Sequence, residues 1–362
     1  MNRIIALLAC LVVLSSASTV LAQPTAQFWE EVGGSASGDG LSAATRGVPT
    51  GNRQVSVAVG PDGRPVVAYA DGDTILVRRW TGAAWELIGP SSASGGLPQI
   101  VTDAAGRMYL AWRQFVPPTE SFEIFLLARD WTGTTWQPLG TSGSGGGISG
   151  AEGGAGVPAY SLALGPDGTP YIAYQSTTFT EADFTTQTAG LHAWTNQISG
   201  REGGGASNAL SFKIEGHGTT TFVSHNAEHP TLAIGADGKP VVAFIYSSMF
   251  EGGNPPEFNG ENDDMYAVRW NGTAWEPLGP ALPTTLDNVA LGAPGGISNT
   301  PGWIREVGHD RLVRPSIMVD RDGTPVLAWG ETNFDDGFRY IYVYKFNGTS
   351  WQGLGSPSGQ ID

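Results

Sequence analysis

The sequence predicts an all-β protein, a β-propeller of four-stranded antiparallel blades. One strand–turn–strand pattern recurs five times along the 362 residues, and a recurring supersecondary unit of this size is the mark of a repeat architecture. Long apolar stripes of helical period with caps are absent. The 52 Gly, 24 Pro and 12 Trp residues agree with many tight turns between aromatic-rich strands.

The first hairpin of each repeat joins an apolar strand to a second strand that ends in an aromatic residue. In the first copy it runs from Val55 to Tyr69 around Gly60-Pro61-Asp62-Gly63. Pro fixes φ at the second turn position and Gly takes the left-handed one, so the Asp-Gly pair has a structural role. The other copies begin near Pro98, Tyr160, Pro230 and Pro315 and end at Trp112, Tyr174, Phe244 and Trp329.

The second hairpin contains an aromatic residue, a polar residue, Gly, two further residues and Trp. Asn271-Gly272 and Asn347-Gly348 are strong two-residue turns of this kind. Two hairpins make one blade, and stacked blades bury the faces that a single blade leaves open. We therefore expect the closing tryptophans to be largely buried at equivalent positions. They are Trp85, Trp136, Trp275 and Trp351.

The number of blades depends on both ends of the pattern. Trp29 to Gly33 matches the end of a fourth strand but precedes the first repeat. Five repeats plus this N-terminal strand favour a five-bladed ring, with six blades as the alternative. The extra strand could displace its C-terminal equivalent, or a further blade could be incomplete or come from a partner chain. The third repeat is irregular over residues 199–229, where no Gly-x-x-Trp follows Trp194.

The N-terminus has the pattern of a signal peptide. Asn2-Arg3 precedes the apolar run from Ile4 to Leu14, and Val20-Leu21-Ala22 is typical of a cleavage site. We expect residues 1–22 to be removed after Ala22, leaving 23–362 as a single secreted, extracellular propeller domain. The periplasm and the cell surface are alternative locations, and Leu7 to Cys10 gives a lipoprotein alternative. Cys10 is the only cysteine, so the mature chain would hold no disulfide.

The net charge of −15 restricts the partners of the chain. Sequence-independent binding to nucleic acid needs a basic surface, which this composition excludes. No segment after the signal is long and apolar enough for membrane insertion. An acidic surface suits solubility and the binding of cations.

Several boxes carry a family resemblance. They are the segment from Trp29 to Gly38, the Asp-Gly-x-Pro-Val-Val-Ala-Tyr box that ends at Tyr69, Gly146-Gly147-Ile148-Ser149-Gly150 and Gly295-Gly296-Ile297-Ser298-Asn299. The chain resembles the tandem-repeat β-propellers of secreted or surface proteins of bacteria, and more distantly the lectin-like and sialidase-like propellers. The resemblance implies the fold and leaves the function open, because propellers support many activities.

Long variable segments between the second and third strands of each repeat are the predicted functional loops, since function usually resides in loops on a rigid scaffold. They are rich in acids that could bind a cation such as calcium or contact sugar hydroxyls, or that could simply form a solvated rim. Asp320-Arg321-Asp322-Gly323 is a fragment of a calcium loop. The predicted ligand-binding residues are Asp71, Asp73, Glu261, Asp263, Asp264, Glu331, Asp335 and Asp336.

No nucleophile elbow, P-loop or dinucleotide motif occurs in the sequence. We therefore expect an extracellular, non-catalytic recognition propeller that requires no cofactor and binds a glycan or an extracellular protein. One alternative is a carbohydrate-active hydrolase or lyase that uses loop carboxylates. The other is a structural surface module.

Overall fold

The structure of the protein is a computed structural model. It describes residues 30–35, 40–42, 55–90, 93–117, 121–140, 142–149, 155–156, 159–179, 187–195, 212–213, 225–252, 257–272, 275–280, 296–298, 302–303, 315–333, 338–355 and 360–361. Side chains are described in these ranges except at 42, 155–156, 175–179, 187–195, 212–213, 225–228, 246–252, 257–263, 302–303, 332–333, 339 and 360–361. The predicted signal peptide lies outside the described residues.

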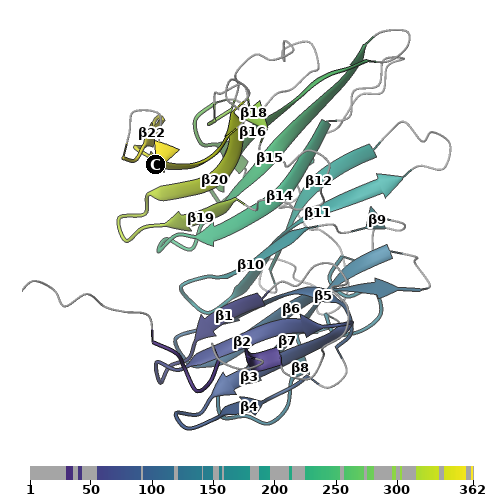
Figure 1. The fold of residues 1–362 in the computed structure, drawn as a ribbon, viewed down its shortest axis with the longest axis vertical. Helices are drawn as coiled ribbons and strands as arrows, with labels where there is room; N and C mark the ends of the chain where they lie inside the picture. The colour runs from purple at the N-terminus through teal and green to yellow at the C-terminus, as the bar shows by residue number, and fades with distance from the viewer. Residues whose placement is uncertain are drawn as a thin grey trace, which may run out of the picture.

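The described strands form five antiparallel sheets that follow one another along the chain (Figure 1). The first contains β1 (Val55–Val59), β2 (Pro65–Asp71), β3 (Thr74–Trp80) and β4 (Trp85–Leu87). The second contains β5 (Gly96–Thr102), β6 (Arg107–Val116), β7 (Ser121–Asp130) and β8 (Gln137–Pro138). The third contains β10 (Tyr160–Leu164), β11 (Pro170–Phe179), β12 (Gln187–Thr195) and β13 (Phe212–Lys213), with β9 (Ala155–Gly156) beside β11.

The last two sheets complete the repeat. The fourth contains β14 (His225–Ile234), β15 (Pro240–Gly252), β16 (Glu257–Trp270) and β17 (Trp275–Pro277). The fifth contains β19 (Ser316–Val319), β20 (Pro325–Asn333), β21 (Arg339–Phe346) and β22 (Trp351–Gly353), with β18 (Gly302–Trp303) on β20 and β23 (Gln360–Ile361) on β21. A short 3-10 helix spans Gly40–Ser42. None of the helices in the described part of the chain could cross a membrane.

The turn of the first hairpin has the predicted geometry. Gly63 has φ of 76°, and its N–H donates to the carbonyl of Gly60 at 3.0 Å. The Asp62 carboxylate accepts a hydrogen bond from the N–H of Arg64 at 3.0 Å. The Asp-Gly pair therefore shapes the turn, as its sequence indicates.

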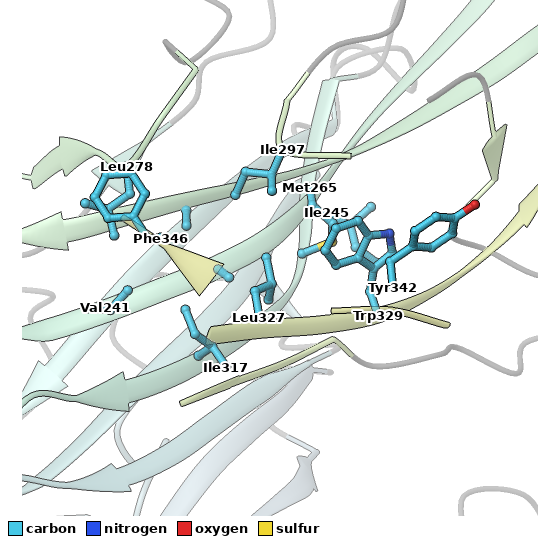
Figure 2. Packing of buried hydrophobic residues seen from close by; sticks show 12 residues of the cluster. Val241, Ile245, Met265, Leu278, Ile297, Ile317, Leu327, Trp329, Tyr342 and Phe346 are labelled. Atoms are coloured by element: carbon cyan, nitrogen blue, oxygen red, sulfur yellow. The ribbon is translucent and has the colours of Figure 1, made fainter. Parts of the chain in front are cut away.

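Successive sheets pack face to face through their first strands, β1 on β5, β5 on β10, β10 on β14 and β14 on β19. At each junction the later sheet contributes aromatic side chains, which pack mainly against aliphatic side chains of the earlier sheet. At the last junction Trp329 and Tyr342 stack at 5.6 Å and lie beside Ile245 and Met265 of the fourth sheet (Figure 2). The chain is thus an all-β propeller of antiparallel sheets stabilised by hydrophobic packing between blades.

The closing tryptophans lie at equivalent positions and are mostly but not completely buried. The reason is that β4, β17 and β22, which they open, are the outermost strands of their sheets. Their indole groups join neighbouring sheets: Trp136 Nε1 donates to the Ile88 carbonyl at 2.9 Å, and Trp351 Nε1 donates to the Leu278 carbonyl at 2.7 Å. The expected inter-blade role is confirmed, and the tryptophans are mostly, though not completely, buried.

The N-terminal segment takes the position of a fourth-strand end without forming a strand. Trp85 Nε1 donates to the Val32 carbonyl at 2.8 Å, as Trp136 does to Ile88. Gly33 has φ of 59° and lies so close to Trp80 that a Cβ would come within 2.1 Å of its ring. Residues 33–35 form a turn, so the predicted N-terminal strand is absent over the described residues 30–35.

Candidate functional site

The long segments predicted as loops are largely extensions of strands. β15 and β16 remain paired from Val241 opposite Arg269 to Gly252 opposite Glu257, and β6 and β7 pair as far as Val116 and Ser121. Polar side chains do not interrupt an antiparallel ladder, because the backbone hydrogen bonds are made whatever the side chains are. Many of the predicted loop acids therefore lie on strands.

One register position at this end of every sheet carries at least one polar residue. It lies two residues after the aromatic residue of the second strand, and it faces a residue on the third strand. Residues directly opposite one another share a face of the sheet. The five pairs are Asp71 and Thr74, Gln114 and Glu123, Ser176 and Gly190, Tyr246 and Asp264, and Glu331 and Tyr340. Four of the five sheets thus place one carboxylate at the same level.

Glu123 is buried and fixed through both carboxylate oxygens. The hydroxyls of Ser121 and Ser149 donate to Oε1 and Oε2, each at 2.5 Å. The Ser149 hydroxyl in turn accepts the N–H of Ile124 at 2.9 Å. Two hydroxyl donors suit a carboxylate, which in its ionised form only accepts hydrogen bonds.

Asp264 repeats this arrangement in the fourth sheet. The Ser298 hydroxyl donates to Asp264 Oδ1 at 3.1 Å and accepts the N–H of Met265 at 3.3 Å. Ile297, beside Ser298, donates its N–H to the Met265 carbonyl at 2.6 Å. The recurring Gly-Gly-Ile-Ser motif is therefore a clamp that runs beside the third strand and directs its serine at the carboxylate.

The glycine before the Ile-Ser pair is required by this close approach. Gly147 has φ of 64°, and a Cβ there would lie 2.1 Å from the carbonyl oxygen of Ile124. Gly296 has φ of 61°, and its Cβ would lie 2.5 Å from the Met265 carbonyl oxygen. Only glycine fits the left-handed conformation at such a distance from the backbone.

Glu331 is the most deeply buried carboxylate of the described site, with 1% of its surface exposed. Trp329 Nε1 donates to Glu331 Oε2 at 3.0 Å. Burial raises the pKa of Tyr344, and the negative charge of Glu331 raises it further. In the fourth sheet burial, followed by the charge of Asp264, raises the pKa of Tyr266 to about 12. The site therefore couples buried negative charge to tyrosine hydroxyls.

The predicted ligand-binding residues do not all reach an exposed rim. Asp71 is half-buried at the end of β2, Asp73 is exposed in the following turn, and Asp264 and Glu331 are buried between sheets. Glu261 and Asp263 lie on β16 opposite Met249 and Ser247, with side chains outside the described set. Asp335 and Asp336 lie outside the described residues. The buried pair is explained by the clamp serine and the indole donor, which satisfy carboxylates that solvent does not reach.

Glu123, Ser149 and Ser298 are functional candidates that the sequence reasoning did not select. A signal existed, because the Gly-Gly-Ile-Ser motif recurs. An exposed aromatic pair occupies the next register position of the second sheet, on the face opposite to Glu123: Phe115 and Phe122 lie opposite one another on β6 and β7, with ring centroids 5.4 Å apart. Phe115 is 46% exposed and Phe122 is 41% exposed.

A metal site finds no support in the described residues, where no group of three or more His, Cys, Asp and Glu side chains could hold an ion. In the calcium-loop fragment, Asp320 Oδ1 accepts the N–H groups of Asp322 and Thr324 at 3.0 and 2.9 Å. Its Oδ2 accepts Lys345 Nζ at 2.7 Å. These contacts give Asp320 the role of a turn-forming, ion-paired residue.

No protein-family model and no curated protein matches the sequence. Among solved structures, the chain is similar to an endo-arabinase from Bacteroides thetaiotaomicron, with 10% identity over 84% of this chain and 92% of that one and a TM-score of 0.38. It is similar to an α-L-arabinanase from Penicillium chrysogenum, with 14% identity over 81% and 88% of the chains and a TM-score of 0.42. It is also similar to an α-L-arabinofuranosidase of Fusarium graminearum, with 13% identity over 85% of this chain and 84% of that one and a TM-score of 0.43.

The expected non-catalytic recognition propeller is corrected by these structures, which are named as an endo-arabinase, an α-L-arabinanase and an α-L-arabinofuranosidase. The alternative, a carbohydrate-active hydrolase, agrees better with them. Identities of 10 to 14% with TM-scores of 0.38 to 0.43 describe a likeness of strand arrangement. A functional argument must therefore come from the side chains of this chain.

Proposed function

We propose that the protein is an exported, carbohydrate-active hydrolase. Its site lies towards the end of the sheets at which the second strand of each sheet leads into the third. The observation that carries the proposal is the set of buried, hydrogen-bonded carboxylates at one register level, Glu123, Asp264 and Glu331. Export follows from the predicted signal peptide. The ring that presents these groups is proposed to have five blades, one for each sheet.

Glycoside hydrolysis needs two carboxyl groups, one that protonates the leaving oxygen and one that acts as base or nucleophile, about 5–10 Å apart. Glu123 suits the second role, because both of its oxygens are oriented by hydroxyl donors. Glu331 accepts the indole N–H of Trp329 and Asp264 accepts the hydroxyl of Ser298, and each is a candidate for the acid. Orientation by fixed donors is the preorganisation that such a site requires.

An exposed aromatic pair at this end of the second sheet, on the face opposite to Glu123, is consistent with a carbohydrate ligand. Phe115 and Phe122 are exposed, and the Arg113 guanidinium lies 4.4 Å from the centroid of the Phe122 ring. The apolar faces of sugar rings pack on exposed aromatic side chains, which bury apolar area with little loss of conformational freedom. Contiguous apolar patches on a surface, unlike single exposed residues, commonly mark an interaction site.

The test is a panel of chromogenic arabinofuranosides and xylosides, with arabinan and xylan as polymers. We expect release of sugar by the wild-type chain and a loss of about 100-fold or more in kcat/KM when a catalytic carboxylate becomes an amide. The variants are E123Q, D264N and E331Q. The control is E276Q, because Glu276 is an exposed carboxylate on β17 that also accepts a side-chain hydrogen bond, from Asn271.

Calorimetry must show that each variant is folded. A folded wild-type chain that releases no sugar from any substrate overturns the proposal, as do three amide variants that all keep the rate of E276Q. Products that absorb as unsaturated sugars would assign a lyase instead.

A further inference from the structure

A hydrogen bond from a tryptophan to the residue two positions later occurs in both the second and the fifth sheet. Trp112 Nε1 donates to Gln114 Oε1 at 3.2 Å, and Trp329 Nε1 donates to Glu331 Oε2 at 3.0 Å. Both acceptors occupy the register position at which the carboxylates of the candidate site lie. The two sheets thus share one arrangement, with a neutral amide in one and a carboxylate in the other.

The indole bond fixes the direction in which the amide of Gln114 faces. An indole N–H can only donate, so the amide oxygen must face Trp112 and the NH2 group must point away from it. Gln114 is half-buried. Its nitrogen makes no hydrogen bond to the part of the chain that the structure describes, yet it is not among the described polar atoms that are buried without a partner. Solvent, and therefore a ligand, can reach this NH2 group.

Gln114 lies directly opposite Glu123 on the neighbouring strand. Side chains in directly opposite positions share a face of the sheet, with Cβ atoms about 5 Å apart. Glu123 is 2% exposed, so Gln114 is the more accessible member of the pair. A ligand that reaches the Glu123 carboxylate must therefore pass the amide of Gln114.

We propose that Gln114 is a substrate-binding residue, whose NH2 group donates a hydrogen bond to the sugar hydroxyl next to the carbon at which Glu123 acts. This inference rests on the proposed hydrolase function for the class of ligand. A sugar hydroxyl both donates and accepts hydrogen bonds, whereas an ionised carboxylate only accepts them. Gln114 supplies the donor that Glu123 lacks.

The hydroxyl in question is the 2-hydroxyl of an aldose, which neighbours the carbon where the glycosidic bond is broken. Hydrogen bonds to this hydroxyl strengthen in the transition state of glycoside hydrolysis. A site that donates to a hydroxyl also rejects the analogue that lacks it, because the donor is then left without a partner. Gln114 is thus expected to select sugars that carry the 2-hydroxyl over their 2-deoxy forms.

The fifth sheet shows what an acid would do in the place of Gln114. Glu331 accepts the same indole bond but, when ionised, offers no donor. A carboxylate at position 114 would also bring a second negative charge beside Glu123, and two close carboxylates raise the pKa of one of them. The amide keeps the indole contact, supplies a donor and leaves Glu123 ionised.

The test combines removal of the amide with removal of the hydroxyl. Wild type and Gln114→Ala are compared on the 4-nitrophenyl glycoside that is cleaved best and on its 2-deoxy analogue. We expect Gln114→Ala to lower kcat/KM at least about tenfold on the parent glycoside, the loss of one hydrogen bond, and less than about threefold on the 2-deoxy analogue, because coupled partners give non-additive losses. The control is Gln137→Ala, since Gln137 is exposed on β8 of the same sheet, and it should change neither rate.

A binding measurement makes the outcome independent of turnover. Methyl arabinofuranoside, methyl xyloside and their 2-deoxy forms are titrated into wild type, Gln114→Ala and Gln137→Ala and followed by NMR. Wild type should bind one parent glycoside at least about tenfold more tightly than its 2-deoxy form, and Gln114→Ala should lose this preference. If Gln114→Ala does not fold, the preference of the wild type decides, and equal affinities overturn the proposal.

Gln114→Glu adds a readout that a purely structural role would not move. The variant keeps an acceptor for the Trp112 indole, as Glu331 does for Trp329. We expect it to raise the pKa of Glu123 by about one pH unit or more, measured by NMR titration of the carboxyl carbons with Glu123→Gln for assignment. An unchanged pKa would show that residue 114 does not face Glu123 and would overturn the proposal.

The remaining outcomes separate this inference from the hydrolase proposal. Equal losses on the parent and 2-deoxy glycosides would give Gln114 a structural role and overturn the inference while hydrolysis stands. Binding with the expected preference but without turnover would support Gln114 and overturn the hydrolase alone. A folded wild-type chain that binds none of these sugars overturns both.

Discussion

Replacing Gly147 by alanine should be markedly more damaging than the same change at Gly145, two residues earlier in the same segment. Both glycines have left-handed backbones, with φ of 64° and 61°. A Cβ on Gly145 would meet nothing within 4 Å, whereas a Cβ on Gly147 would lie 2.1 Å from the Ile124 carbonyl oxygen. The comparison therefore separates backbone strain from collision with the strand.

The magnitude follows from these two terms. The left-handed conformation costs a non-glycine residue about 1–2 kcal/mol, which we expect for Gly145→Ala. Gly147→Ala adds the displacement of the clamp, about 1–3 kcal/mol by comparison with overpacked cores, for a total of about 2–5 kcal/mol. The displacement would also lengthen the 2.7 Å bond from Ile148 N to the Ile124 carbonyl and move Ser149 away from Glu123.

Urea unfolding and calorimetry of the two variants give the comparison directly. Equal stability of the two variants, within about 0.5 kcal/mol, the scatter of ordinary surface substitutions, would refute the clamp. A second sign of the clamp is specific to the site. If Glu123 acts in hydrolysis, Gly147→Ala should lower kcat in the folded protein and Gly145→Ala should not.

Three further predictions concern single contacts. Because burial and then Asp264 raise the pKa of Tyr266 to about 12, the stability linked to this phenol should be complete below about pH 10, its unfolded value, and fall as the pH rises towards 12. Asp264→Asn should lower the pKa of Tyr266 while leaving it above 10. The titration of this one phenol is the difference between the ultraviolet titration curves recorded with and without the Tyr266→Phe substitution. An unchanged pKa would exclude the coupling. The Lys345 ammonium lowers the pKa of Asp320 below 3.8, so its contribution should be present above about pH 4 and be lost as the pH falls further. Asp320→Asn should therefore be less stable than the wild type at pH 7, and a stability gap that stays constant down to pH 2 would contradict this. Trp351→Phe loses the 2.7 Å bond to the Leu278 carbonyl and should lose about 1–2 kcal/mol; calorimetry showing no change would mean that the indole does not join the sheets.

The hairpins were predictable because their chemistry is local. The bond from Gly63 N to Gly60 spans three residues, and the residue types that favour it stand next to each other in the sequence. The same holds for Asn347, whose side chain accepts the N–H groups of Thr349 and Ser350. Local turn chemistry fixes where strands begin, and the repeat then implies the stacking of blades.

The burial of the site acids was not predictable in the same way. Ser149 is 26 residues from Glu123 and Ser298 is 34 residues from Asp264, so no local pattern reveals these contacts. Asp264 and Glu331 read as solvated loop acids, because an acid next to glycines and asparagines usually faces water. Their strands continue further than composition suggests, and this continuation carries them between the sheets.

The most direct test of the account is the pH dependence of kcat/KM for the substrate that the panel identifies. An acid and a base that act together should give a bell-shaped profile whose two apparent pKa values belong to the pair. We expect at least one limb to disappear in one of the variants E123Q, D264N and E331Q, while E276Q keeps both limbs. Bell-shaped profiles that are the same in all four variants would contradict a role for these buried carboxylates in the reaction.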